Sequence, residues 1–340
     1  MNGDKTEYAY SVARVRALET GLLDRGKIER MVEARDAAEA LKVLGETPYA
    51  AAVGQLASVY DYESMLRREL VAVRALFWKI SPHPELTDLF FLKYDVLNLK
   101  LLLKGRHLGQ KTDDLLVAAG TIGPERLAAM AAADNWKELP AELAAAAHQA
   151  GEALAEEGDP QLVDTLLDKA YYAYLTRVLG EQGEEFLRAL VSLQVDLTNI
   201  KTFVRVRHVV GGDAARARAL LPRFFLPGGR LALDYFLAQV EEPLPAFADR
   251  LAKDALGPVV GEGITAWQRE KSLTRYEKLA DDFLLAYVKK SRLIAFGVEP
   301  LVAYLMAKEN EIKLIRIIMV GKINGLPAAE IRERLRDVYA

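Results

Sequence analysis

Three segments of this chain share one pattern of residues, and this internal repeat constrains the fold more than any other feature. The segments align on Lys100, Lys201 and Lys313, which lie about a hundred residues apart. Four offsets around each lysine are apolar in every copy: Leu89/Leu190/Val302, Leu92/Leu193/Leu305, Leu99/Ile200/Ile312 and Leu102/Phe203/Ile315. Steps of three, seven and three residues place these side chains on one face of a helix. The pattern therefore predicts three helices with equivalent core-facing stripes.

Polar residues also recur, mainly in the first two copies. The shared pairs are Asp95/Asp196, Asn98/Asn199 and His107/His208, and the third copy has Lys308, Glu311 and Val320 in their places. Segments 116–127 and 221–231, which follow the first two copies, resemble each other in a Gly/Pro turn and a new helix start. Little chain follows the third copy. We expect its counterpart of that turn at the N-terminus, in Leu22-Leu-Asp-Arg-Gly-Lys-Ile.

These correspondences predict similar helical units whose ends meet. The expected boundaries are 1–107 for unit one, 108–210 for unit two, 211–322 for unit three, and 323–340 for a C-terminal helix that closes against the N-terminal unit. Such an arrangement indicates pseudo-threefold symmetry, and a symmetric body of this kind suits a part that sits on an axis.

Helical periodicity dominates the chain, so the expected fold class is all-α. Asp36 stands three residues before Glu39 and is a candidate N-cap for a helix that ends at Gly45. Further expectations are a short helix capped by Asp114 that ends near Gly120, a break at Gly261–Gly263, helical spacing throughout 267–296, and a last helix over Ala328–Tyr339.

Composition excludes several classes of function. The chain has 340 residues, is 51% hydrophobic and carries a formal charge of −3, which gives no general attraction to nucleic acid or to an anionic membrane. It has no cysteine, so disulfides and thiolate metal sites are excluded. Residues 1–10 lack an apolar signal core, and no window is long and apolar enough for a membrane span. We therefore expect a cytoplasmic protein that contacts a membrane only through a partner.

Five motifs together resemble the central-stalk C subunit of archaeal and bacterial V/A-type ATPases, whose eukaryotic counterpart is the d subunit. The segments that carry the resemblance, in order, are Tyr8-Ala-Tyr-Ser-Val-Ala-Arg-Val-Arg-Ala-Leu-Glu, Tyr94-Asp-Val-Leu-Asn-Leu-Lys, Val195-Asp-Leu-Thr-Asn-Ile-Lys, Phe225-Leu-Pro-Gly-Gly-Arg-Leu and Lys308-Glu-Asn-Glu-Ile-Lys-Leu-Ile-Arg. The likeness implies a funnel of three helical domains. Its wide mouth would receive the central axle of the soluble head, and its other end would dock on the membrane ring of proteolipid subunits. It also implies a rotor part without catalytic residues.

The repeated cations are the candidate partner contacts. Two interpretations apply to Lys100, Lys201 and Lys313. They form a ring of charges that faces a partner on the axis, or each lysine lies along the core of its own unit or pairs with an acid. For any one lysine the second interpretation is favoured. About one helical turn further on lie Arg205, Arg207 and Arg316, which are further candidate partner contacts.

Other residue types give no catalytic, cofactor or metal site. The four histidines, which are His83, His107, His148 and His208, lack the spacing of a zinc hydrolase, and Gly321-Lys322 lacks the rest of a phosphate loop. Two alternatives to the rotor part stay open: a generic helical-repeat scaffold that binds a protein in a groove, and an enzyme with an unrecognised site. Three units that close on one another favour the rotor part over the scaffold, which would be an open array. No cluster of catalytic residue types recurs in the sequence, which argues against the enzyme.

Overall fold

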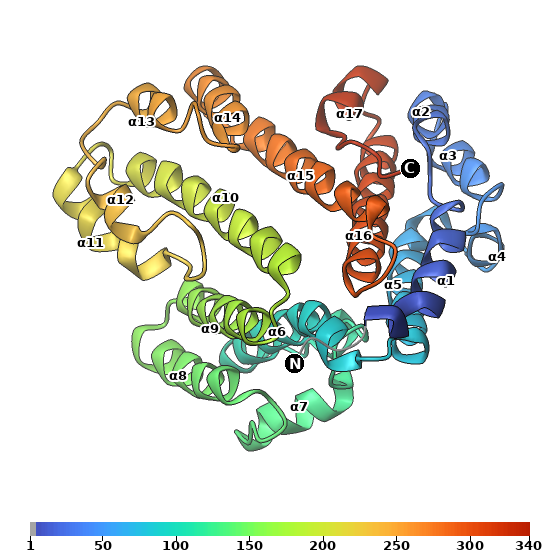
Figure 1. The fold of residues 1–340 in the computed structure, drawn as a ribbon, viewed down its shortest axis with the longest axis horizontal. Coiled ribbons are helices and arrows are strands. Elements are labelled where there is room, and N and C mark those ends of the chain that lie inside the picture. Colours follow the sequence, from blue (N-terminus) through green and yellow to red (C-terminus); the bar gives the residue numbers. More distant parts are fainter. Residues whose placement is uncertain (1–4) are drawn as a thin grey trace. The chain divides into compact units, whose positions relative to one another are not determined.

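The computed structural model describes residues 5–340, so residues 1–4 of the N-terminal stretch lie outside the described residues. The described chain consists of α-helices with a few short 3₁₀ turns, and it contains no β-strand (Figure 1). The prediction of an all-α fold is confirmed. None of the helices in this part of the chain has the length and apolar character needed to cross a membrane.

The described residues form two compact units. Unit 1 is Asp88–Tyr276, and unit 2 combines residues 5–87 with Glu277–Ala340. Unit 2 thus joins residues from both ends of the chain, whereas the division into three similar domains stays a prediction.

Unit 1 contains a helical hairpin and a cluster of shorter helices. Helix α8 packs along α9, and α9 packs against α10 (Figure 1). The elements are α6 (Pro84–Leu108, which begins in unit 2), the 3₁₀ turn η3 (Asp113–Leu115), α7 (Pro124–Ala133), α8 (Ala141–Glu157), α9 (Pro160–Glu181), α10 (Glu185–Val209), α11 (Ala214–Phe224), α12 (Leu233–Leu237), α13 (Leu244–Arg250) and α14 (Gly257–Glu270).

Unit 2 is organised around one buried helix. Helix α16 contacts α1, α2, α3, α5 and α17, and most of its residues are buried, although the face that carries Arg316 and Val320 is exposed. The elements are η1 (Lys5–Tyr8), α1 (Ala9–Glu19), α2 (Arg25–Glu33), α3 (Ala37–Leu44), α4 (Ala50–Val53), η2 (Val59–Asp61), α5 (Tyr62–Ile80), α15 (Thr274–Lys289, which begins in unit 1), η4 (Lys290–Leu293), α16 (Glu299–Ile323) and α17 (Ala328–Arg334).

The three repeat copies lie on the three longest helices. Helices α6, α10 and α16 each have 25 residues. Every residue of the four predicted apolar offsets is buried, except Leu102, which is partly exposed. Phe203 is completely buried, and its ring centroid lies 4.8 Å from that of Phe247 and 5.6 Å from that of Phe236. The repeated stripe is therefore a core-facing stripe.

Several helix ends match the sequence signals. The side chain of Asp36 accepts a hydrogen bond from the backbone N–H of Glu39, and helix α3 ends before Gly45 as predicted. Other predictions were wrong. Asp113–Leu115 forms only a 3₁₀ turn, and the last helix ends at Arg334.

The largest correction concerns α14, which runs unbroken through Gly261 and Gly263. Gly263 serves close packing, because a Cβ atom there would lie 2.6 Å from Cδ2 of Tyr276. The break falls instead at Lys271, which has a left-handed φ of 53° and separates α14 from α15. The predicted continuous helical spacing over 267–296 is therefore interrupted.

Candidate interaction sites on the repeated helices

Asp95, on α6, holds the segment that follows that helix. Its Oδ2 accepts hydrogen bonds from the backbone N–H of Thr121 at 2.7 Å and from the Thr121 hydroxyl at 2.6 Å, and its Oδ1 accepts from Ile122 N–H at 3.1 Å. The carboxylate lies directly against Gly120, where a Cβ atom would be 2.0 Å from Oδ1. Only glycine leaves room for this contact.

Asp196 does the same on α10. It accepts from Leu231 N–H at 3.0 Å and from Arg230 Nε at 2.9 Å, and a Cβ atom on Gly229 would lie 2.4 Å from its Oδ1. Burial raises the pKa of Asp196, although the hydrogen bonds from Leu231 and Arg230 oppose this shift. The two aspartates found by the repeat therefore have one task, which is to hold a glycine turn against the long helix.

Asn98 and Asn199 provide a second attachment one turn further along. The Asn98 amide donates to Val117 O at 2.9 Å and accepts from Val117 N–H at 2.8 Å. Asn199 makes the same two bonds with Leu226, at the same distances. Both asparagines are fully buried. Each amide thus satisfies a backbone donor and a backbone acceptor that would otherwise be buried without partners.

Glu311 takes the place of the asparagine on α16. Its Oε2 accepts a hydrogen bond from the backbone N–H of Leu23 at 2.6 Å. This contact confirms that the N-terminal segment supplies the counterpart of the turn in the third copy. We call the three contacts made by Asn98, Asn199 and Glu311 the segment latches.

The three latched segments share a pattern that sequence reasoning missed. Each has an apolar residue, two variable residues, a glycine, one variable residue and a second apolar residue: Leu23-Asp-Arg-Gly-Lys-Ile, Val117-Ala-Ala-Gly-Thr-Ile and Leu226-Pro-Gly-Gly-Arg-Leu. The first residue of each is the one bound by its latch. The glycine at the same position in all three segments is the signal that could have identified this pattern from the sequence.

A buried ionic cluster replaces the aspartate in the third copy. Lys308 Nζ lies 2.7 Å from Glu311 Oε1 and 2.7 Å from Glu69 Oε1, and the Tyr49 hydroxyl donates to Glu311 Oε1 at 2.7 Å. Lys308 and Glu311 are almost completely buried. Burial alone lowers the pKa of Lys308, but the charges of Glu311 and Glu69 outweigh it and keep this pKa above its usual value. The cluster joins α5, α16 and the residues before α4.

The predicted lysines differ in their surroundings. Lys100 Nζ pairs with Asp168 Oδ1 on α9 at 2.6 Å, and burial raises the pKa of Asp168 while Lys100 opposes the shift. Lys313 Nζ pairs with Asp281 Oδ2 at 2.9 Å. Lys201 is half-buried on α10. Lys100 and Lys313 therefore each neutralise an acid within their own unit.

The predicted arginines also have distinct positions. Arg316 forms a two-pronged pair with Glu63, with Nε–Oε1 and Nη2–Oε2 distances of 2.6 and 3.0 Å. The half-buried Arg207 places its guanidinium 5.4 Å from the Phe203 ring centroid, and burial lowers its pKa. Arg205 is exposed. Their role as partner contacts stays a prediction.

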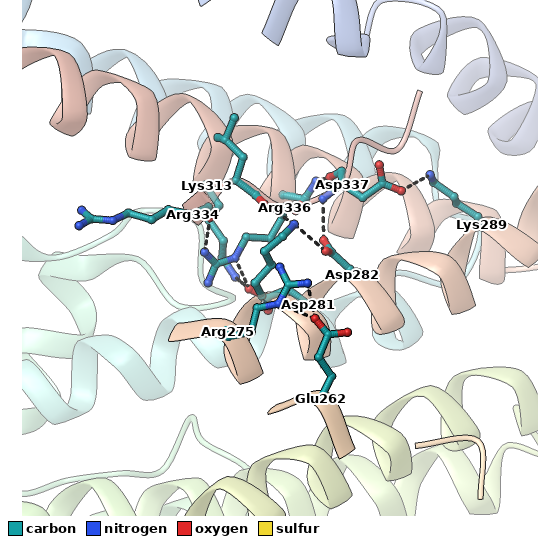
Figure 2. A network of polar contacts seen from close by, with 12 residues as sticks. Glu262, Arg275, Asp281, Asp282, Lys289, Lys313, Arg334, Arg336 and Asp337 are labelled. Atoms are coloured by element: carbon teal, nitrogen blue, oxygen red, sulfur yellow. Dashed lines mark hydrogen bonds and ion pairs between the residues drawn. The ribbon is translucent and has the colours of Figure 1, made fainter. Parts of the chain in front are cut away.

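Lys313 belongs to a network that fixes the C-terminal residues of unit 2. Figure 2 shows Lys313 and Arg336 converging on Asp281, and Arg336 Nε lies 2.8 Å from Asp281 Oδ2. Asp282 accepts from the backbone N–H of Asp337 at 2.6 Å. Burial of Tyr339 completes the attachment of the segment after α17. This network explains why residues beyond the last helix lie against the unit.

Histidines of the repeat occupy the last turns of their helices, where a cation is mildly favoured. His208 packs edge-on against Trp267, with ring centroids 5.0 Å apart. No group of three or more histidine, aspartate or glutamate residues is arranged to hold a metal ion within residues 5–340.

Comparisons with known proteins agree with this architecture. A family model described as ATP synthase (C/AC39) subunit matches residues 11–334. The C subunit of the A-type ATP synthase of Methanocaldococcus jannaschii is 27% identical over an alignment 351 residues long, gaps included, which covers 98% of this chain and 87% of that protein. The C subunit of the V-type sodium ATPase of Enterococcus hirae is 27% identical over 327 residues, which cover 96% of this chain and 97% of that protein. Because the match runs through all three repeated helices, the chain belongs to the ATP synthase (C/AC39) subunit family.

Proposed function

We propose that this protein is the socket of a rotary ATPase, a non-catalytic central-stalk subunit that links the axle of the soluble head to the membrane proteolipid ring. In this role it lies on the cytoplasmic side of the membrane and transmits rotation between the two partners. Its three repeats form the three domains of a funnel with pseudo-threefold symmetry.

The repeated segment latches are the observation that carries the proposal. A part that transmits torque has to resist deformation, and the latches at Asn98, Asn199 and Glu311 each fasten a neighbouring segment to a long helix. Close-packed helical cores add stiffness. The contact between Glu311 and Leu23 supports closure in particular, because it joins residues from opposite ends of the chain.

The surroundings of the charged residues support a role without catalysis. Lys100, Lys313 and Arg316 each pair with a carboxylate of the same unit. Paired groups of this kind stabilise structure and are poorly placed to act on a substrate. On this account the nucleotide-hydrolysing residues belong to other subunits of the complex.

A binding experiment tests the proposed function. The purified chain is mixed separately with purified axle subunits and with the detergent-solubilised proteolipid ring, and then with both together. We expect it to bind each partner alone, to hold the two in one complex, and to hydrolyse no ATP by itself. Failure to bind either partner, or ATP hydrolysis that follows this chain through purification, refutes the proposal.

A further inference from the structure

Residues 335–340 follow α17 without forming a helix or a strand, and this segment is here called the strap. Its backbone is extended at Leu335, where φ is −69° and ψ is 141°. Leu335, Val338 and Tyr339 are nevertheless buried. An extended segment outside a sheet cannot pair its own N–H and C=O groups, so their partners have to come from other residues.

Side chains of unit 2 supply these partners at every second residue of the strap. The four hydrogen bonds run from Lys278 Nζ to Leu335 O, from Asp337 N to Asp282 Oδ1 at 2.6 Å, from Asn310 Nδ2 to Asp337 O at 2.8 Å, and from Arg292 Nη2 to Tyr339 O. They fall on residues 335, 337 and 339, as expected of an extended chain that turns one face to its binding surface. This surface, here called the strap site, is formed by Lys278, Asp281 and Asp282 on α15, Arg292 on η4 and Asn310 on α16.

Side chains of the strap add contacts that depend on its sequence. Arg336 Nε lies 2.8 Å from Asp281 Oδ2, and Figure 2 shows the two side chains converging. The Tyr339 hydroxyl donates to Glu19 Oε1 at 2.9 Å, and the guanidinium carbon of Arg292 lies 4.4 Å from the centroid of the Tyr339 ring. Proteins recognise extended peptides by these two components, main-chain bonds for affinity and side-chain contacts for specificity.

The strap is attached independently of α17. That helix is anchored by Ile331, which packs so closely on Gly321 of α16 that a Cβ atom there would lie 2.7 Å from Ile331 Cγ1. A cavity of about 400 Å³ lies beside the strap, and its lining includes Leu335, Val338 and Ile28. Because protein interiors are otherwise close-packed, the cavity marks a side on which the strap is held loosely. The strap can therefore leave its site while α17 stays in place.

We propose that the strap site is a peptide-binding site, which the chain fills with its own residues 335–340 and which opens when the strap detaches from a folded unit 2. A short tether gives the strap an effective concentration in the millimolar range, so even modest contacts keep the site occupied in cis. Several of these contacts are partly exposed ion pairs, which salt screens. The occupant that fits is an extended segment with a cation and, three positions later, an aromatic residue, as in Arg336 and Tyr339. The inference does not depend on the axle or the ring.

A full-length variant with an empty site tests the proposal. Arg336→Glu places a carboxylate beside Asp281, and Tyr339→Ala removes the buried ring, so together they detach the strap and leave the strap site unchanged. A labelled synthetic peptide with the sequence of residues 333–340 is titrated into this double variant and into the wild type. The control peptide carries the same two substitutions, and the melting temperature of both chains is measured in parallel.

We expect the double variant to stay folded and to bind the wild-type peptide with a Kd below about 1 mM, since a weaker site would not be filled in cis. The control peptide should bind at least about tenfold more weakly, and high salt should weaken binding of the wild-type peptide. The wild-type chain should also bind it more weakly, because its strap competes. A folded double variant that binds no peptide, or a double variant that does not fold, contradicts the proposal.

Hydrogen exchange of the wild-type chain gives a second, independent measurement. The Asp337 amide, which is bound to Asp282, should be at least about tenfold less protected than amides in the middle of α16, and less protected still at high salt. Equal protection of Asp337 and the middle of α16 would mean that the strap leaves only when the whole unit unfolds, which overturns the inference.

Discussion

Replacing Glu311 with alanine should release the N-terminal segment from α16 and lower the free energy of unfolding by about 3–5 kcal/mol, the usual cost of breaking a buried ion pair from one side. The substitution removes the acceptor for Leu23 N–H and the partner of both Lys308 and Tyr49. Lys308 then loses one of its two carboxylate partners and keeps its contacts with Glu69 and with the Tyr49 hydroxyl. The measurements are chemical denaturation of the chain and hydrogen exchange at the Leu23 amide.

A local readout separates the latch from general destabilisation. Exchange at Leu23 should accelerate in Glu311→Ala more than exchange at Leu226, which belongs to the latch of Asn199 in unit 1. Glu330→Ala, an exposed acid on α17, is the control and should change stability by less than about 0.5 kcal/mol. Unchanged stability together with unchanged protection of Leu23 would show that the Glu311 contact does not hold the N-terminal segment.

Replacing Phe203 with alanine should have an effect of similar size in unit 1. Phe203 is completely buried and packs against Phe236 and Phe247, so its removal leaves a cavity that costs about 3–5 kcal/mol. It also removes the ring beneath the Arg207 guanidinium. Phe296→Ala, at an aromatic residue that is 45% exposed, provides the control and should melt close to the wild type.

The same substitution should impair energy coupling if the chain is the socket. A softened unit 1 transmits torque poorly, so ATP hydrolysis by the complex should persist while ATP-driven ion uptake into vesicles falls. Uptake and melting that both match the Phe296→Ala control would contradict this expectation, and the stripe through Phe203 would then not be the core of the socket.

Much of the helical framework was predictable from local and repeated patterns. The apolar stripe around Lys100, Lys201 and Lys313 located the three 25-residue helices, because burial of one helix face requires a period near 3.6 residues. The repeat also indicated that Leu22-Leu-Asp belongs beside the third copy, which the bond from Leu23 to Glu311 confirms. The cap at Asp36 followed from the short range of capping interactions.

The parts that sequence could not predict depend on contacts between distant residues. Gly263 looked like a helix breaker, yet it lies within α14 because Tyr276 packs against its backbone. The recurrence of Asp95 and Asn98 was visible, but their roles were not, because the segments that they hold lie 19 to 27 residues further along the chain. For the same reason, the acids that pair with Lys100 and Lys313 became known only from the folded units.

The central claim is that this chain couples the soluble head to the membrane ring, and a reconstitution with and without the chain tests it most directly. Vesicles that contain the ring and its membrane partners are combined with the soluble head, and ATP hydrolysis and ion uptake are measured before and after the purified chain is added. We predict hydrolysis without uptake in its absence, and uptake restored by the wild-type chain but restored poorly by Glu311→Ala. Full ATP-driven ion uptake in vesicles that lack this chain would contradict the account.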